Sequence, residues 1–218
     1  TTTDQISAGI LGENLVRNGA VHLATPFPAA NQAVNRQVAQ LLRGNLNNPD
    51  STFVETAFQV DFAVNEDEAG NLIHFLLLVI AVPGLLIWKK TRTSEVMDFT
   101  LAVITSILLF SLFLKWQPWG SRLQTPIFLL GSVLIGVFFS RLVEKGIPGG
   151  LLAAVLFLGS LPYLFVNTTR PLLPLLKEES AVYETKLYLY TANRIDKFLI
   201  SHPGIDETLS PVKQVFYK

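Results

Sequence analysis

Four long runs without a charged residue dominate the middle of this sequence and limit what it can fold into. The runs are Ala69–Trp88, Phe99–Leu114, Leu123–Ser140 and Gly146–Thr169, with 20, 16, 18 and 24 residues. An α-helix rises about 1.5 Å per residue, so roughly 17–25 apolar residues cross the hydrocarbon core of a bilayer. Three runs reach this length, and the second reaches it if its flanking side chains extend to the interface. We therefore expect an all-α integral membrane protein with about four transmembrane helices.

Composition supports this class and excludes several others. Hydrophobic residues make up 50% of the 218 residues and charged residues 16%, whereas soluble domains carry about 25% charge. The 17 basic residues balance the 17 acidic ones, so we expect no nucleic-acid partner. Cysteine is absent, which excludes disulfides and thiolate chemistry. The sequence has no P-loop, dinucleotide fingerprint, nucleophile elbow or His-Glu-x-x-His motif, so those enzyme classes are excluded as well.

The region before the first run, residues 1–68, predicts an external segment with amphipathic helices. Ala8–His22 and Ala29–Arg43 both show apolar residues at helical spacing, with Leu11 and Leu15 on the candidate apolar face of the first. Such helices lie at the bilayer surface or against the helix bundle. Because the chain opens without Met or a signal peptide, we also expect further sequence before it.

The rest of the chain divides at the ends of the apolar runs. Asn45–Ser51 is typical of a turn, and Thr52–Val64, which is β-branched and aromatic, predicts a short strand or extended segment. Residues 69–170 form the predicted four-helix transmembrane region. Residues 171–218 regain charge and predict a small external C-terminal segment.

The basic residues between the runs predict the orientation. Five lie in the loops after the first and third runs, and three flank the runs on the other side. The first group is Lys89, Lys90, Arg92, Arg141 and Lys145, and the second is Lys115, Arg122 and Arg170. The positive-inside rule then places both termini outside. We expect a multi-pass protein of the cell membrane with both ends of this segment extracytoplasmic.

The loop before the third run is the first candidate site. It contains Lys115, Trp116, Trp119 and Arg122. Tryptophans at a membrane boundary are common interfacial anchors, but two cations on the outer side need another explanation. An arginine fork at the start of a membrane helix and a nearby lysine suit a lipid phosphate. Arg170, at the end of the last run, is a further phosphate contact or an interface anchor.

Polar residues at the start of the first run form the second candidate site. Glu66 and Asp67 are either a solvated acidic cap or carboxylates that hold a divalent cation or a sugar hydroxyl. His74 follows Asn71 by three residues and shares its helix face, so it either makes a buried hydrogen bond or contacts substrate. Neither His22 nor His202 has a partner at metal-ligand spacing, so we assign no metal site.

Four motifs together resemble a known family. They are ENLVRNGAVHLATPFPAANQAV, NEDEAGNLIHFLL, KWQPWGSRLQTPIF and LPYLFVNTTRPLLP. In order and placement they resemble the C-terminal half of bacterial glycosyltransferases of the family 39 type, which are dolichyl-phosphate-mannose protein mannosyltransferase-like proteins of the GT-C class. The resemblance covers most of residues 10–180.

The resemblance implies an integral membrane enzyme that transfers a sugar from a polyprenyl-phosphate donor on the extracytoplasmic face. It places Arg122 near the lipid phosphate. In that family the catalytic carboxylate lies in the N-terminal half, which nothing here matches, so the catalytic residue of this chain is unknown. The chain would supply the donor-lipid side and would have the missing half or other membrane subunits as partners. The alternative is a non-catalytic accessory subunit of a larger membrane complex.

Overall fold

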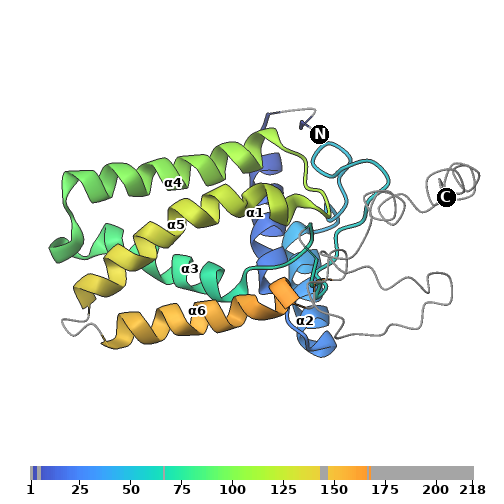
Figure 1. The fold of residues 1–218 in the computed structure, drawn as a ribbon. Coiled ribbons are helices and arrows are strands. Elements are labelled where there is room, and N and C mark those ends of the chain that lie inside the picture. The colour runs from blue at the N-terminus through green and yellow to red at the C-terminus, as the bar shows by residue number, and fades with distance from the viewer. Residues whose placement is uncertain (1, 4–5, 66, 143–146, 166, 168–218) are drawn as a thin grey trace, which may run out of the picture. The chain divides into compact units, whose positions relative to one another are not determined.

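The fold is taken from a computed structural model that describes residues 2–3, 6–65, 67–142, 147–165 and 167. These residues form α-helices and short 3-10 helices, with no named strand among them (Figure 1). The chain divides into two compact units, residues 1–63 with 67–159, and residues 64–66 with 160–218. The predictions for Glu66, Arg170 and residues 171–218 lie outside the described residues. In the second unit the described helix is the end of α6, from Ser160 to Phe165.

The two N-terminal helices form where the apolar spacing predicts them. Helix α1 spans Ala8–Ala20 and continues into the 3-10 helix η1, Val21–Leu23. Its N-cap is Ser7, whose hydroxyl oxygen accepts a hydrogen bond from the Ile10 amide at 3.2 Å. Helix α2 spans Pro28–Leu42, starts on a proline that suits the first helical position, and ends at a left-handed Arg43. Both predicted helices are confirmed to within about two residues.

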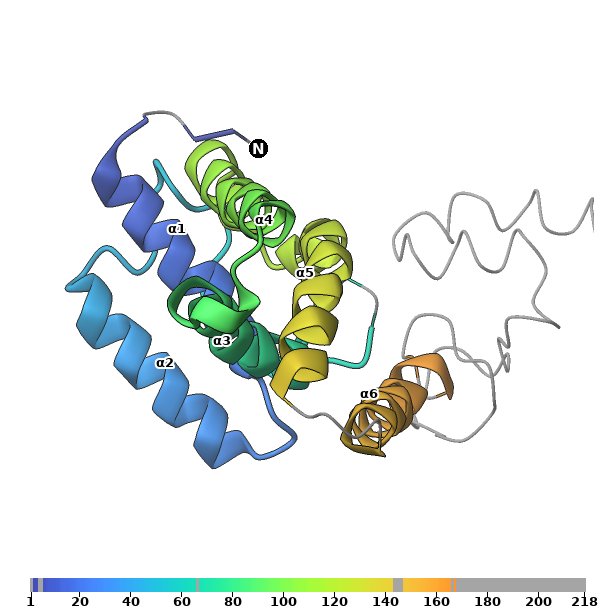
Figure 2. The same ribbon diagram turned by 90° about the vertical axis from the view of Figure 1, so that its left-hand side faces the viewer.

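The buried face of α1 is largely polar, which the apolar spacing of the sequence did not predict. Leu11 and Leu15 are only partly buried. The buried residues are mostly polar: Ile10, Glu13, Asn14, Arg17, Asn18 and Ala20. The helix crosses one end of the long helices, as Figures 1 and 2 show, and meets backbone carbonyls there. Those carbonyls need hydrogen-bond donors, which apolar side chains cannot supply.

Each uncharged run contains an α-helix among its described residues. Helix α3 spans Leu72–Ile87, α4 spans Ser94–Phe113, α5 spans Gly120–Leu142 and α6 spans Ile147–Phe165. A short 3-10 helix, η2, spans Lys89–Thr91 between α3 and α4. Within the described chain, α4 and α5 are long and apolar enough to cross a membrane, while the apolar stretches of α3 and α6 are shorter.

Helix α4 starts five residues before its uncharged run. The Thr93 hydroxyl oxygen accepts a hydrogen bond from the Val96 amide at 3.4 Å and so caps the helix. Glu95 lies in the first turn, where the helix dipole favours an acid. A run defined only by the absence of charge therefore misses the capped first turn of this helix.

Helices α3 and α5 pack closely because glycines remove side chains from their contact. A Cβ at Gly131 would lie 2.7 Å from a methyl carbon of Leu78, and one at Gly84 would overlap the Phe138 ring. Small residues allow helix backbones to approach in this way. The buried core of the long helices consists of Leu78, Ala81, Leu85, Val103, Leu134, Ile135 and Phe138.

A second core lies under the N-terminal helices and the extended segment. Its buried members are Ala20, Ala24, Val38, Leu42, Phe58, Val60 and Trp116. Between Thr52 and Val64 the described chain forms no named strand. It contains an isolated bridge between Thr52 and Trp116 and a turn at residues 54–55. The Asn35 side chain replaces a strand partner. Its amide donates to the Val60 carbonyl at 3.0 Å, and its carbonyl accepts from the Val60 amide at 2.7 Å.

Candidate functional site

Arg122 and Asp67, which the sequence assigned to separate candidate sites, meet in the structure. Arg122 lies in the first turn of α5, and its Nη1 donates to Asp67 Oδ1 at 2.9 Å. Their side chains are 66% and 42% exposed. An ion pair this exposed contributes about 0–1 kcal/mol, since water screens it. The contact between Arg122 and Asp67 is therefore weak, and a competing anion can replace it.

The face of α5 that carries Arg122 continues as an exposed apolar surface. Leu129, Leu130 and Val133 follow at helical spacing and are 71%, 42% and 52% exposed. The opposite face of α5 is buried against α3 and α4. A cation at the head of an apolar stripe matches the layout of a lipid with an anionic head group.

Lys115 lies in a different environment from Arg122. Its side chain is largely buried, and its Nζ donates to the Pro49 carbonyl at 2.8 Å. Asn45–Ser51, where the sequence predicted a turn, does form turns, so Lys115 fastens the start of the α5 loop to that segment. This contact gives Lys115 a structural role.

The two tryptophans of the loop also differ. Trp116 belongs to the N-terminal core, where its ring packs edge-on against Phe58 with centroids 5.0 Å apart. Its backbone amide and carbonyl pair with Ser51 and Phe53, each at 2.8 Å. Trp119 is 40% exposed and stacks edge-on against Phe53 at 5.2 Å. Of the two, only Trp119 presents a surface to a ligand or a lipid interface.

Asn71 and His74 lie at the start of α3, and His22 reaches the first of them. The Asn71 backbone amide donates to His22 Nδ1 at 3.2 Å. His74 is partly buried on the first turn of the helix. The described residues include no group of three or more histidines or acids placed to hold a metal ion.

His22 starts a buried hydrogen-bond chain that the sequence interpretation missed. Because Nδ1 accepts from Asn71, Nε2 carries the proton and donates to Gln124 Oε1 at 3.0 Å. Gln124 Nε2 then donates to Asn18 Oδ1 at 3.5 Å, and Asn18 Nδ2 donates to Ser111 Oγ at 3.1 Å. Burial lowers the pKa of His22 to about 4, while the hydrogen bond to Gln124 opposes that change. The hydrogen-bond chain from His22 to Ser111 therefore carries no charge.

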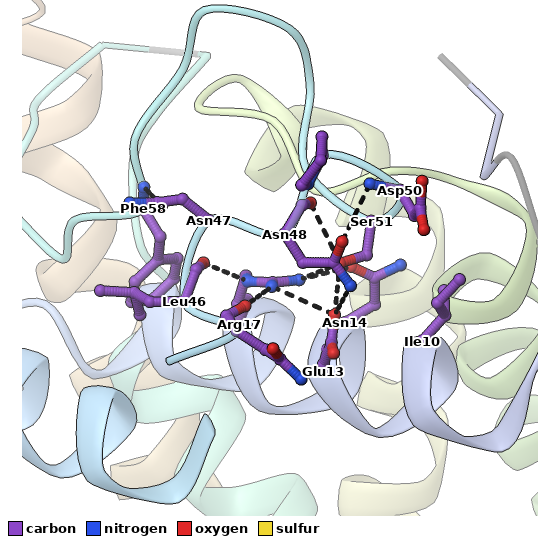
Figure 3. Close-up of polar contacts among 12 residues, drawn as sticks. Ile10, Glu13, Asn14, Arg17, Leu46, Asn47, Asn48, Asp50, Ser51 and Phe58 are labelled. Carbon is purple, nitrogen blue, oxygen red and sulfur yellow. Dashed lines mark hydrogen bonds and ion pairs between the residues drawn. The ribbon is translucent and has the colours of Figure 1, made fainter. Parts of the chain in front are cut away.

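A second polar cluster surrounds Arg17, whose side chain is fully buried (Figure 3). Its Nε donates to the Leu46 carbonyl at 2.9 Å, and its Nη2 donates to the Asn45 carbonyl. Nη1 donates to Asn14 Oδ1 at 3.1 Å and to Ser51 Oγ at 3.0 Å. Arg17 thereby joins α1 to the turn after α2.

Glu13 balances the charge of Arg17. Its Oε2 lies 3.4 Å from Arg17 Nη2, accepts from Asn48 Nδ2 at 3.0 Å, and accepts from the Ser51 hydroxyl. Burial lowers the pKa of Arg17 and the Glu13 carboxylate opposes the change. A sequence signal for both clusters exists, since Asn14, Arg17 and Asn18 recur at three- and four-residue spacing on one helix face.

Comparison of the chain with protein-family models, with curated proteins and with solved structures gives no match.

Proposed function

We propose that this chain forms the donor-lipid side of a membrane glycosyltransferase that takes a sugar from polyprenyl phosphate on the extracytoplasmic face. The observation that carries the proposal is the exposed Arg122 guanidinium, which lies at the head of the apolar, exposed stripe of α5. The motif resemblance, which assigns a phosphate contact to Arg122, supports the same role.

The geometry suits a phosphate-headed lipid. A guanidinium fork pairs two of its N–H groups with two phosphate oxygens. The N-terminus of α5 adds favourable dipole charge at the same place, and the stripe Leu129, Leu130 and Val133 offers an apolar surface to the prenyl chain. When the anomeric carbon leaves the donor, the phosphate gains charge that Arg122 stabilises. The carboxylate base that activates the acceptor would come from outside this chain.

Asp67 competes with the donor phosphate for Arg122. The exposed pair contributes about 0–1 kcal/mol, whereas a phosphate can accept two parallel hydrogen bonds from the guanidinium fork and, as a monoester, carries more negative charge than a carboxylate. The stronger phosphate contact favours exchange of the carboxylate for the phosphate. Asp67 then holds the arginine in place until a donor binds.

In this proposal α3, α4, α5 and α6 all cross the membrane, with both ends of the segment outside. Helix α3 has 16 residues, which span about 24 Å, so its flanking residues complete the crossing. Beyond its end, Arg92 Nε donates to the Leu86 carbonyl at 2.7 Å. This contact satisfies a terminal carbonyl of α3, and a cation at this end of the helix supports the proposed orientation, with Arg92 at the inner interface.

The alternative function is that of a non-catalytic subunit in a larger membrane complex. The Arg122–Asp67 ion pair favours it. In this pair the arginine already contacts an acid of the same chain, and a subunit that only packs against other helices needs no phosphate ligand. The two functions differ in one property, which is selective binding of a phosphate-headed prenyl lipid.

The test uses the full chain in lipid nanodiscs and measures affinity for polyprenyl monophosphate and for the matching polyprenol. We expect the phosphate to bind more tightly, and Arg122→Met to weaken it by roughly 10- to 150-fold, which corresponds to 1.5–3 kcal/mol. Arg141→Met is the matched control, since Arg141 lies in the last turn of the same helix. Equal affinity of the two lipids, or of Arg122→Met and the parent chain, would overturn the proposal and favour the subunit function.

A further inference from the structure

A cavity of about 390 Å³ lies among α1, α3, α4 and α5, within the first compact unit. Its walls are apolar for most of their length, and include Phe75 and Val82 of α3, Val103 and Ile107 of α4, and Phe128 of α5. The lining of α3 runs from Phe75 to Pro83, about 12 Å along the helix at 1.5 Å per residue. The cavity is therefore as large as a ligand pocket and is elongated along the helices.

One end of the cavity is polar. Asn18, His22, Ser111 and Gln124 line it, and all are more than nine-tenths buried. They are the members of the neutral hydrogen-bond chain that starts at His22. Each amide nitrogen of Asn18 and Gln124 has two N–H groups, and within the described chain only one of each has a partner. Buried N–H groups need acceptors, so this end can bind an oxygen atom.

None of the residues that line the cavity carries a formal charge at neutral pH. His22 is neutral there because burial lowers its pKa to about 4. An anionic head group that entered would lose its hydration without gaining a counter-charge, which is costly. The cavity therefore selects an uncharged molecule, and its apolar walls favour a hydrocarbon chain over water.

This cavity is distinct from the surface at Arg122. Gln124 follows Arg122 by two residues, which places the two side chains about 200° apart around α5. Gln124 is buried and lines the cavity, whereas Arg122 is exposed. The two faces of one helix thus have opposite chemistry.

We propose that the cavity binds one uncharged single-chain amphiphile, a long-chain alkyl or prenyl alcohol. Its hydroxyl oxygen accepts from the second amide N–H of Asn18 or Gln124, and its chain lies between α3 and α4. The chain enters past Val79 and Pro83, which line the cavity and are themselves exposed at the surface of α3. This ligand differs from the phosphate-headed donor, so the inference stands whether or not the proposed function does.

The experiment uses the full chain in nanodiscs and a photoreactive diazirine analogue of dodecanol. Labelled peptides are mapped by mass spectrometry. We expect saturable labelling of α3 and α4, and competition by dodecanol at least about tenfold stronger than by dodecyl phosphate, because the cavity offers no counter-charge. Val79→Trp, which fills the entrance, should reduce labelling by at least about tenfold, as overfilled sites exclude ligand. The matched control is Leu101→Trp, because Leu101 is exposed on α4 and does not line the cavity.

Three outcomes would overturn the inference. Equal labelling of the parent chain and Val79→Trp would show partition on the exposed helix faces. Equal competition by dodecane and dodecanol would show that the hydroxyl group makes no contact that favours binding. Loss of alcohol labelling in Arg122→Met would mean that the alcohol occupies the phosphate surface. Because Arg122→Met is also the variant in the phosphate-binding test, failure of the two proposals can be told apart.

Discussion

Replacement of Arg17 by Met should detach the turn after α2 from α1. The guanidinium is fully buried and donates to the carbonyls of Leu46 and Asn45 and to the side chains of Asn14 and Ser51 (Figure 3). Methionine fills a similar volume but donates nothing. The Glu13 carboxylate would stay buried without its counter-charge.

The size of the effect follows from these contacts. Removal of one partner from a buried ion pair costs about 3–5 kcal/mol. Glu13 keeps its bonds from Asn48 and from the Ser51 hydroxyl, which limits the cost of its lost partner. The two carbonyls each lose a donor, at about 1 kcal/mol per bond. We expect about 3–5 kcal/mol in total, or roughly two to four orders of magnitude in the opening equilibrium.

Hydrogen–deuterium exchange of the full chain in nanodiscs measures this opening directly, on peptides that cover residues 45–52. Arg17→Met should exchange there at least about a hundredfold faster, while peptides of α5 keep their protection. Arg36→Met is the matched control, because Arg36 is exposed on α2. An increase in exchange rate below about tenfold, or an equal increase in Arg36→Met, would refute the conclusion that Arg17 holds this turn against α1.

Two further predictions concern pH and helix packing. Burial lowers the pKa of His22 from 6.5 to about 4. The neutral imidazole therefore contributes about 3 kcal/mol to the free energy of unfolding above pH 6.5, and this contribution is lost as the pH falls to about 4. The free energy of unfolding should depend less on pH across this range in His22→Gln, and an unchanged dependence would assign it to another group. Gly84→Ala would push a methyl group into the Phe138 ring and should cost about 1–3 kcal/mol, as thermal unfolding in detergent would show. Gly136→Ala, which meets no atom within 4 Å, should leave the unfolding temperature nearly unchanged; equal effects of the two would contradict the close α3–α5 contact.

The positions of the helices could be predicted because local chemistry decides them. Ser7, Pro28 and Thr93 start helices by capping or by a fixed φ, and long uncharged runs have few other ways to satisfy their backbone. The same local reasoning could not predict the side chain that pairs with the backbone of Val60. Its partner is the Asn35 side chain, 25 residues away, and an asparagine on an amphipathic helix looks the same whether it faces water or a backbone.

The sequence named candidate site residues but not their neighbours in the fold. The sequence singled out Arg122 and Asp67, but no spacing rule brings together residues 55 positions apart. Lys115 and Trp116 read as interface residues in sequence, since lysines and tryptophans gather there. In the fold Lys115 donates a hydrogen bond to the Pro49 carbonyl, and the Trp116 ring packs against the ring of Phe58.

The sequence by itself therefore determined the helical class, the approximate position of each helix and the chemistry available on it, because charge exclusion and apolar length act within a few residues. The tertiary structure decided which faces are buried. On α1 it buries Glu13, Asn14, Arg17 and Asn18 in preference to Leu11 and Leu15. The physical reason is that a turn and helix ends present unpaired carbonyls at this one place, and only donors on the facing helix can satisfy them out of water.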